Sequence, residues 1–431
     1  MGWLNLYSVF GCLAIVGLAW VTSSNRRAIS WNTVLSGIVS MASVAGVIFW
    51  FPPFRSILVT CNSTINLFLA ASREGIQFLF GPLSLSPGEP NSLGPIIAFQ
   101  VLPTIIFFSV ITALFYYIGF LPWVVHNTAR LVRQGFKLSG AEAVATASNL
   151  FVGIESVLMI RPFIKGMTKS ELMMILTAGL STIASTVLAF YVSLLQDVFP
   201  YIAGHLISAS VISIPAAIII AKILVPETQK PLSMEKIPPM ESYMDARHWM
   251  SSIIWGANEG VRLAFGIGAL LIGMLGLVAI IDLILSGTSS WVTGQFIGQE
   301  FRWTVKIVLQ WLAYPLVLCL GLSPGEWSEA AKLLGERWIL TEVIAFQDLR
   351  HLVSDQSISP RGLLILSYSL CGFTHIASMA IFVGGISTIE PSRREDIVAL
   401  SWRALWGASL ATTLTGSIAG TFYYGQSGLL F

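Results

Sequence analysis

The chain has 431 residues, of which 55% are hydrophobic and only 11% charged, and this composition excludes a soluble globular protein. Its 24 basic and 22 acidic residues give a net charge of +2, and no basic run is interleaved with aromatic residues, which argues against a nucleic-acid partner. The four cysteines have no paired spacing, so neither a disulfide framework nor a zinc site is expected.

Long windows without any charged residue predict membrane-spanning helices. A bilayer core of roughly 30 Å needs about 20 apolar residues in a helix. The windows are residues 1–25, 28–54, 90–129, 172–196, 198–221, 263–281, 307–325, 362–389 and 404–431. The first lacks a basic n-region and precedes many further spans, so we interpret it as a transmembrane helix and not as a secretory signal. Arg26 and Arg27 in the following loop place the N-terminus outside the cell.

Differences in polarity along the chain divide it into four parts. Residues 1–94 hold the N-terminal transmembrane helices and, after FPPFR, a mildly amphipathic run that suits a helix along the lipid headgroups. Residues 95–222 form a first repeat and residues 263–431 a second. Between them, residues 223–262 are the longest polar passage, which we predict to be a linker or interfacial helix.

The two halves contain similar sequences. GLSTIAS spans Gly179 to Ser185 in the first half, and GFTHIAS spans Gly372 to Ser378 in the second. Each is preceded by an apolar segment with an isolated carboxylate, Glu155 in FVGIESVLMI and Glu342 in GERWILTEVIAF. The matching order indicates an internal repeat.

Both glutamate segments are unsuited to a simple span. Residues 141–166 and 324–351 contain glycines, a proline and several charged residues, which would cost several kcal/mol in a continuous lipid-facing helix. We therefore predict an all-α polytopic membrane protein with an internal repeat and two re-entrant helical hairpins. Broken segments at matching positions of two halves indicate a secondary transporter with a site near the bilayer midplane.

The sequences of these segments and their order resemble the concentrative nucleoside transporter family over roughly residues 95 to 425. The segments that carry the resemblance are AFQVLPTIIFFSVITALFYYIG, SGAEAVATASNLFVG, RPFIKGMTKSEL, TAGLSTIASTVLAFYV, AGHLISASVISIPAAIIIAKILVPET and LCGFTHIASMAIFVGGI. The resemblance implies an inverted-repeat transporter fold with two re-entrant helical hairpins and partly unwound transmembrane helices, assembled as a homotrimer. It also implies symport of nucleosides into the cell with sodium or protons by alternating access, without a cofactor. From the compact length of the chain we expect a bacterial inner membrane.

The resemblance assigns roles to individual residues. Glu342 matches an acid that binds ribose hydroxyls, and an ionised carboxylate can accept two such donors. His375 and Ser378 fall where the family has a ribose-contacting asparagine and serine, and Phe373 falls on an aromatic that borders the base. The side chain of Asn149, the carbonyl of Val152 and the hydroxyl of Thr186 match the sodium ligands, and all three supply hard oxygen.

The sequence departs from the family pattern at the first hairpin, where the base is read. Gly153 is followed by Ile154 and Glu155, without the family's glutamine. In one interpretation a residue of the family motif is lost, and Glu155 corresponds to the motif's glutamate. In the other the motif has its full length, and Ser156 stands in place of that glutamate. The distance to Arg161 favours the first interpretation.

The second hairpin departs as well. Thr341 and Val343 stand where the family has asparagine and phenylalanine. His375 replaces an amide by an imidazole, which alters substrate choice or adds a proton-sensitive step.

Other interpretations remain open at this stage. Glu342 could form an ion pair with Arg337 or Lys332, Glu155 one with Arg161, and the small hydroxyl residues could serve helix packing. The ligand could be another hydroxylated or glycoside-like solute, or the chain could be a transport-inactive nucleoside sensor. A membrane enzyme is not expected, because no HExxH, GxSxG or Walker motif is present.

Overall fold

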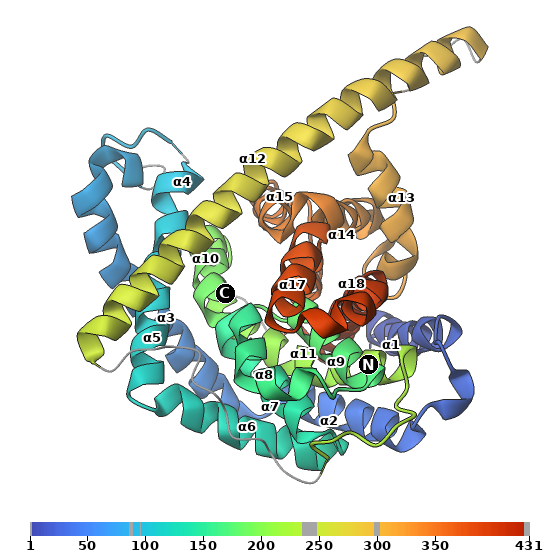
Figure 1. The fold of residues 1–431 in the computed structure, drawn as a ribbon. Helices are drawn as coiled ribbons and strands as arrows, with labels where there is room; N and C mark the ends of the chain where they lie inside the picture. The colour runs from blue at the N-terminus through green and yellow to red at the C-terminus, as the bar shows by residue number, and fades with distance from the viewer. Residues whose placement is uncertain (1, 86–88, 95, 235–247, 297–301, 426–431) are drawn as a thin grey trace.

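The structure is a computed structural model that describes residues 2–85, 89–94, 96–234, 248–296 and 302–425. The side chains of Pro52, Arg55, Ile154, Glu155 and residues 291–296 lie outside the described part, as do residues 235–247 of the predicted polar linker. All regular elements within the described ranges are helices (Figure 1), which confirms the predicted all-α class.

Six helical stretches in the described residues are long and apolar enough to cross a bilayer, which confirms a multi-pass membrane protein. They are α1 (Trp3–Val21), α2 (Trp31–Trp50), α4 with α5 (Ile97–Gln100 and Leu102–Tyr117), α9 with α10 (Lys169–Ser181 and Ser185–Leu195), α11 (Ile202–Leu224) and α12 (Trp249–Phe296). Between and after them lie α3 (Pro52–Phe80), α6 (Phe120–Phe136), α13 (Val305–Val317) and α18 (Arg394–Phe422).

Two helical hairpins and two interrupted helices occupy corresponding places in the two halves. Hairpin 1 consists of α7 (Gly140–Val152), the 3-10 segment η3 (Gly153–Ile160) and α8 (Arg161–Ile164), and hairpin 2 of α14 (Trp327–Leu340) and α15 (Glu342–Ser354). Each precedes an interrupted helix, α9 and α10 in the first half and α16 (Pro360–Leu370) and α17 (Ile376–Ile389) in the second. A long helix follows each pair, α11 and α18. This confirms the predicted hairpins and partly unwound helices.

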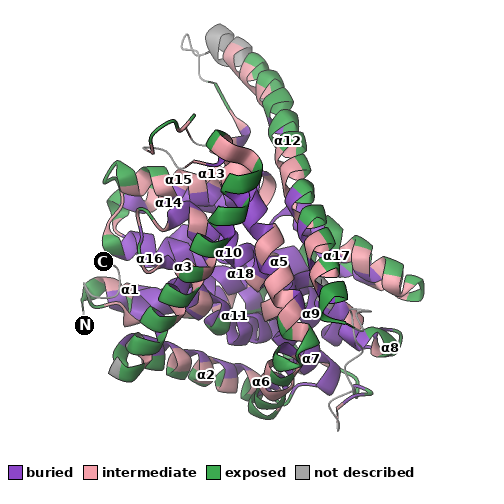
Figure 2. Ribbon diagram, turned by 90° about the vertical axis from the view of Figure 1, so that its left-hand side faces the viewer, coloured by how far each residue is buried: buried purple, intermediate pink, exposed green. Residues whose placement is uncertain are grey.

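The helices around the two interruptions form the buried centre of the molecule, whereas α12 is largely exposed (Figure 2). Small residues let these helices approach closely. A methyl group added to Gly416 of α18 would lie 2.9 Å from the carbonyl oxygen of Ile365 in α16. One added to Gly260 of α12 would lie 2.5 Å from Cα of Ile106 in α5. The helix α12 therefore packs backbone to backbone along α5.

The two interruptions lie side by side. The first break comprises residues 182–184 and the second residues 371–375. A methyl group on Gly372 would lie 3.0 Å from the carbonyl of Ser181, so a glycine is required where the breaks meet. Unwound backbone of both halves is thus gathered inside the protein, where its polar groups can be satisfied away from lipid.

Each hairpin begins with a capping box whose glutamate is buried. Ser139 pairs with Glu142 at the start of hairpin 1, and Ser323 pairs with Glu326 before hairpin 2. Glu326 also accepts a hydrogen bond of 2.7 Å from the backbone N–H of Ser359, the N-cap of α16. The capping glutamate therefore connects the start of hairpin 2 to the start of α16.

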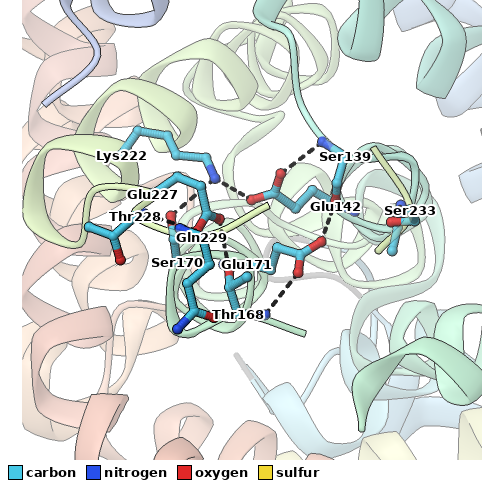
Figure 3. A network of polar contacts seen from close by, with 11 residues as sticks. Ser139, Glu142, Thr168, Ser170, Glu171, Lys222, Glu227, Thr228, Gln229 and Ser233 are labelled. Atoms are coloured by element: carbon cyan, nitrogen blue, oxygen red, sulfur yellow. Dashed lines mark hydrogen bonds and ion pairs between the residues drawn. The ribbon is translucent and has the colours of Figure 1, made fainter. Parts of the chain in front are cut away.

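A larger polar network does the same for hairpin 1 (Figure 3). Glu142 Oε1 lies 2.5 Å from Nζ of Lys222 on α11. The hydroxyl of Ser139 donates to Glu171 of α9 at 2.6 Å, and the hydroxyl of Thr168 donates to Glu227 after α11 at 2.7 Å. These contacts fix the base of hairpin 1 to α9 and α11.

We expect Lys222→Met to lower the free energy of unfolding by about 3–5 kcal/mol, because Glu142 is left as a buried charge without its cation. Thermal unfolding of the purified protein in detergent measures the loss. Adding Glu142→Gln to this variant should recover part of it.

Lys169→Met is the control for this prediction, because the Lys169 side chain is 68% exposed in its ion pair with Asp396. An equal loss in the Lys169 variant would contradict the role given to the buried pair.

Candidate functional site

A cavity lies where the hairpin tips and the helix breaks meet α12. We call it the central cavity. Its polar lining comes from both halves and consists of Thr186, Thr341, Glu342, His375 and Ser378. Its apolar lining consists of Val152, Gly153, Ala184, Val187, Leu263, Ile267, Leu270, Leu271, Val343, Phe373, Ile381 and Phe382. Five of the seven predicted substrate residues are therefore brought together: Thr341, Glu342, Phe373, His375 and Ser378.

The tips of both hairpins have left-handed backbone. Gly153 has φ 64°, and Thr341 has φ 79° with ψ 160°. Glycine accepts this region readily, whereas a β-branched residue is strained there by about 1–3 kcal/mol. The Thr341 side chain is buried, and its Oγ1 has no hydrogen-bond partner among the described residues. Hairpin 2 thus holds an unsatisfied hydroxyl at the cavity.

Glu342 begins α15 and is 4% exposed. The buried hydroxyl of Tyr191 on α10 donates to its Oε1. Its Oε2 lies 2.9 Å from Nε2 of His375, which is within ion-pair distance. The protein therefore holds one carboxylate oxygen with a tyrosine hydroxyl and places an imidazole beside the other.

The ion pairs considered for Glu342 do not form. Lys332 lies 3.7 Å from Asp348. The buried guanidinium of Arg337 donates to the carbonyl of Ser369 and, at 2.9 Å, to the hydroxyl of Thr412. Glu342 therefore has a partner in Tyr191, which the sequence reasoning missed because one tyrosine in an apolar span carries no signal.

The imidazole of His375 caps α17. Its Nδ1 accepts the backbone N–H of Ser378 at 3.1 Å, so the neutral ring with its hydrogen on Nε2 is the form that fits this cap. The Ser378 hydroxyl lies 2.7 Å from Nε2. If Ser378 Oγ accepts from Nε2, its own hydrogen is free to donate towards the cavity.

The predicted cation ligands lie beside the first break. The Asn149 amide donates to Thr182 Oγ1 and, at 3.3 Å, to the carbonyl of Ala178. Among the described residues, its Oδ1 accepts a long contact of 3.5 Å from Ser156 Oγ and no shorter one. Available oxygens from an amide, hydroxyls and a helix end are hard donors, and they suit a sodium ion. Thr182 was missed by sequence reasoning, whereas Val152 and Thr186 line the cavity.

The two substrate residues predicted in the first hairpin stay predictions. Ser156 is buried and contacts Asn149, and it does not line the central cavity. Glu155 lies within η3, and its side chain is outside the described part, so its role and the register of the motif stay predictions.

Comparison with known families identifies the chain. The family model described as "Na+ dependent nucleoside transporter C-terminus" matches residues 205–420, its N-terminal counterpart matches residues 10–83, and "Nucleoside recognition" (Gate) matches residues 98–197. The chain belongs to the sodium-dependent nucleoside transporter family. This family consists of transporters and not of enzymes.

Relatives of similar length support the assignment. An uncharacterized transporter of Haemophilus influenzae is 31% identical over 97% of both chains. The nucleoside permease NupC of Helicobacter pylori is 30% identical over 97% of this chain and 98% of its own.

Structures of CNTnw have the same fold. Its inward-facing substrate-bound state and an outward-facing state of a double variant each match with a TM-score of 0.86 and 29% identity, over 97% of this chain and 98% of theirs. This fold of the sodium-dependent nucleoside transporter family is thus known in two states that face opposite sides of the membrane, as alternating access requires.

We expect Thr341→Gly to raise the free energy of unfolding by roughly 1 kcal/mol, because glycine relieves the left-handed strain at the tip of hairpin 2. Thr341→Ala removes the same unsatisfied hydroxyl but keeps the strained Cβ, so it is the matched control. Thermal unfolding of both variants separates the two effects. An equal gain in the alanine variant would show that the buried hydroxyl, and not the backbone, is the cause.

Proposed function

We propose that this protein is a secondary active transporter that carries nucleosides into the cell together with sodium by alternating access. The observation that carries the proposal is the group of buried polar atoms that faces the central cavity at the tip of hairpin 2. Thr341 Oγ1 has no hydrogen-bond partner among the described residues, and Glu342 Oε2 lies beside His375 Nε2 at 2.9 Å. Buried polar atoms without partners are costly, so a hydroxylated ligand that satisfies them gains binding energy.

The rest of the cavity suits the two parts of a nucleoside. We propose that Glu342, Thr341, His375 and Ser378 bind the ribose hydroxyls, because they offer acceptors and donors together. The walls beside them are apolar and include Phe373, which fits the flat face of a base. We keep Glu155 and Ser156 as candidates for contacts to the base from hairpin 1.

We propose that the coupling cation binds between the end of α7 and the first break. Asn149, Val152 and Thr186 are the proposed ligands, and the contact between Asn149 and Thr182 adds a further hydroxyl oxygen. A cation there would hold α7 against the first break and so order hairpin 1 for substrate. The family likeness supports sodium over a proton as the coupling ion.

The wall contributed by α12 supports the proposed movement. Leu263, Ile267, Leu270 and Leu271 face the cavity from α12 with no polar group among them. Apolar contacts lack directional hydrogen bonds, so the block with both hairpins can slide along α12 and α5 without breaking any there. We propose that this block moves and that the remaining helices form a scaffold in a homotrimer of the bacterial inner membrane.

We expect Glu342→Gln to weaken nucleoside binding by about 10- to 100-fold, because a hydrogen bond to a charged group contributes about 1.5–3 kcal/mol. Binding and uptake of radiolabelled nucleosides by proteoliposomes measure the loss. Glu329→Gln is the control, because Glu329 lies on α14 away from the central cavity.

Uptake at wild-type affinity in the Glu342 variant would overturn the site. For the unmodified protein, gradient-driven accumulation supports a symporter, and saturable binding without flux supports a sensor. Accumulation of a glycoside in place of a nucleoside would change the substrate class.

We expect sodium chloride to raise the thermal unfolding temperature of the wild-type protein more than choline chloride does, and Asn149→Ala to remove most of the difference. The reason is that the amide oxygen of Asn149 is a proposed ligand. Asn127→Ala on α6 is the control, because the Asn127 amide donates to the carbonyl of Trp123 in its own helix and does not line the central cavity. A sodium effect that survives intact in the Asn149 variant would place the ion elsewhere.

A further inference from the structure

Asn149 and Arg337 occupy equivalent positions in the two repeats. Each lies four residues before the tip of its hairpin, Asn149 before Gly153 and Arg337 before Thr341. Each side chain donates to a main-chain carbonyl in the last turn of the first half of the interrupted helix that follows. For Asn149 this is the carbonyl of Ala178 in α9, and for Arg337 that of Ser369 in α16.

The electrostatic environment of both positions is alike. The C-terminal ends of α7 and α9 meet in the first repeat, and those of α14 and α16 meet in the second. Helix C-termini carry unsatisfied carbonyls and partial negative charge, which a cation stabilises. The last turns of α7 and α9 contain no basic residue, whereas the last turn of α14 contains Arg337.

We infer that Arg337 is a fixed cation that does in the second repeat what a bound alkali cation does in the first. Its guanidinium connects the end of α14 to the end of α16 and to Thr412 of α18, and so positions hairpin 2 without an ion from solution. The inference rests on the proposed cation site near Asn149. With Arg337 in place, the second of the two equivalent positions needs no ion from solution.

The surroundings of Arg337 fit this role. The side chain is 1% exposed, and its Nε has no hydrogen-bond partner among the described residues. Burial of a cation costs desolvation energy, which the hydrogen bonds to Ser369 and Thr412 offset in part. Close packing holds the helix in place, because a methyl group on Gly335 would lie 2.5 Å from the backbone of Leu309 in α13.

The role of Glu342 follows from this arrangement. Arg337 is a positioning residue for it, because the two lie on either side of the tip residue Thr341 and Arg337 fixes the helix before the tip. A loose hairpin 2 would carry Glu342 away from Tyr191 and from the ligand. The fixed cation therefore keeps the proposed ribose-binding half formed at all times, while the first half waits for its ion.

The test compares Arg337→Lys, which keeps the charge, with Arg337→Gln, which keeps a donor but removes the charge. Amide hydrogen exchange of the full-length protein in detergent, read for residues 341–350, reports the order of hairpin 2 without any substrate. We expect exchange to be about tenfold faster or more in the glutamine variant and within about twofold of wild type in the lysine variant. Nucleoside affinity should fall and recover in the same pattern.

Lys332→Gln is the matched control. It removes one positive charge from the same helix, but the Lys332 side chain is 37% exposed, and its partner Asp348 on α15 keeps a second cation, Lys306, at 3.4 Å. We expect exchange in residues 341–350 to stay as in wild type.

Each outcome decides the inference. A glutamine variant that exchanges like wild type overturns it, and so do lysine and glutamine variants that are equally disordered, because shape and not charge would then matter. A glutamine variant that fails to fold beside a normal lysine variant supports it. If wild type binds no nucleoside but the exchange contrast holds, the proposed function fails and the fixed cation stands.

Discussion

The structure depends on how backbone groups freed inside the membrane are satisfied. A helix that stops halfway across a bilayer leaves N–H and C=O groups that hydrocarbon cannot bind, so such stops occur only inside protein. Here two interrupted helices stop next to each other, where Gly372 allows their backbones to touch. Side chains then supply the missing partners, as the imidazole of His375 does for the start of α17. A polar site in the middle of an apolar protein is the direct result.

The two repeats share a backbone plan and differ in chemistry. Beside the first break Asn149 donates to Thr182, and both side chains are neutral. Beside the second break Arg337, Glu342 and His375 are all buried. The proposed ion site is thus built from neutral oxygen atoms, and the proposed ribose site from charged or ionisable groups. The two repeats thus differ in side chains at equivalent positions of the same backbone, and this difference separates the two proposed sites.

Much of this arrangement can be predicted from sequence because charged residues in apolar segments are rare and costly. Glu342 and the paired GLSTIAS and GFTHIAS sequences locate hairpin 2 and both breaks. Other parts leave no such mark. Leu263 and Ile267 resemble every other apolar residue of a span, and only packing shows that they face the cavity. Arg337 could be assigned to Glu342 by nearness in sequence, yet its hydrogen bonds go to Ser369 and Thr412, because a carbonyl at a helix end competes for the same donor.

The base and the tip of hairpin 1 differ in how firmly they are held. Its base is held by buried ion and hydrogen-bond contacts, while the segment after its tip, Gly153–Ile160, is a 3-10 helix of eight residues. Such helices seldom exceed about four residues, because their hydrogen bonds are strained. Deforming this segment costs less than unfolding α15 across the cavity. Thermal motion of the hairpin 1 backbone will therefore concentrate in residues 153–160, beside the central cavity, while its base stays in place.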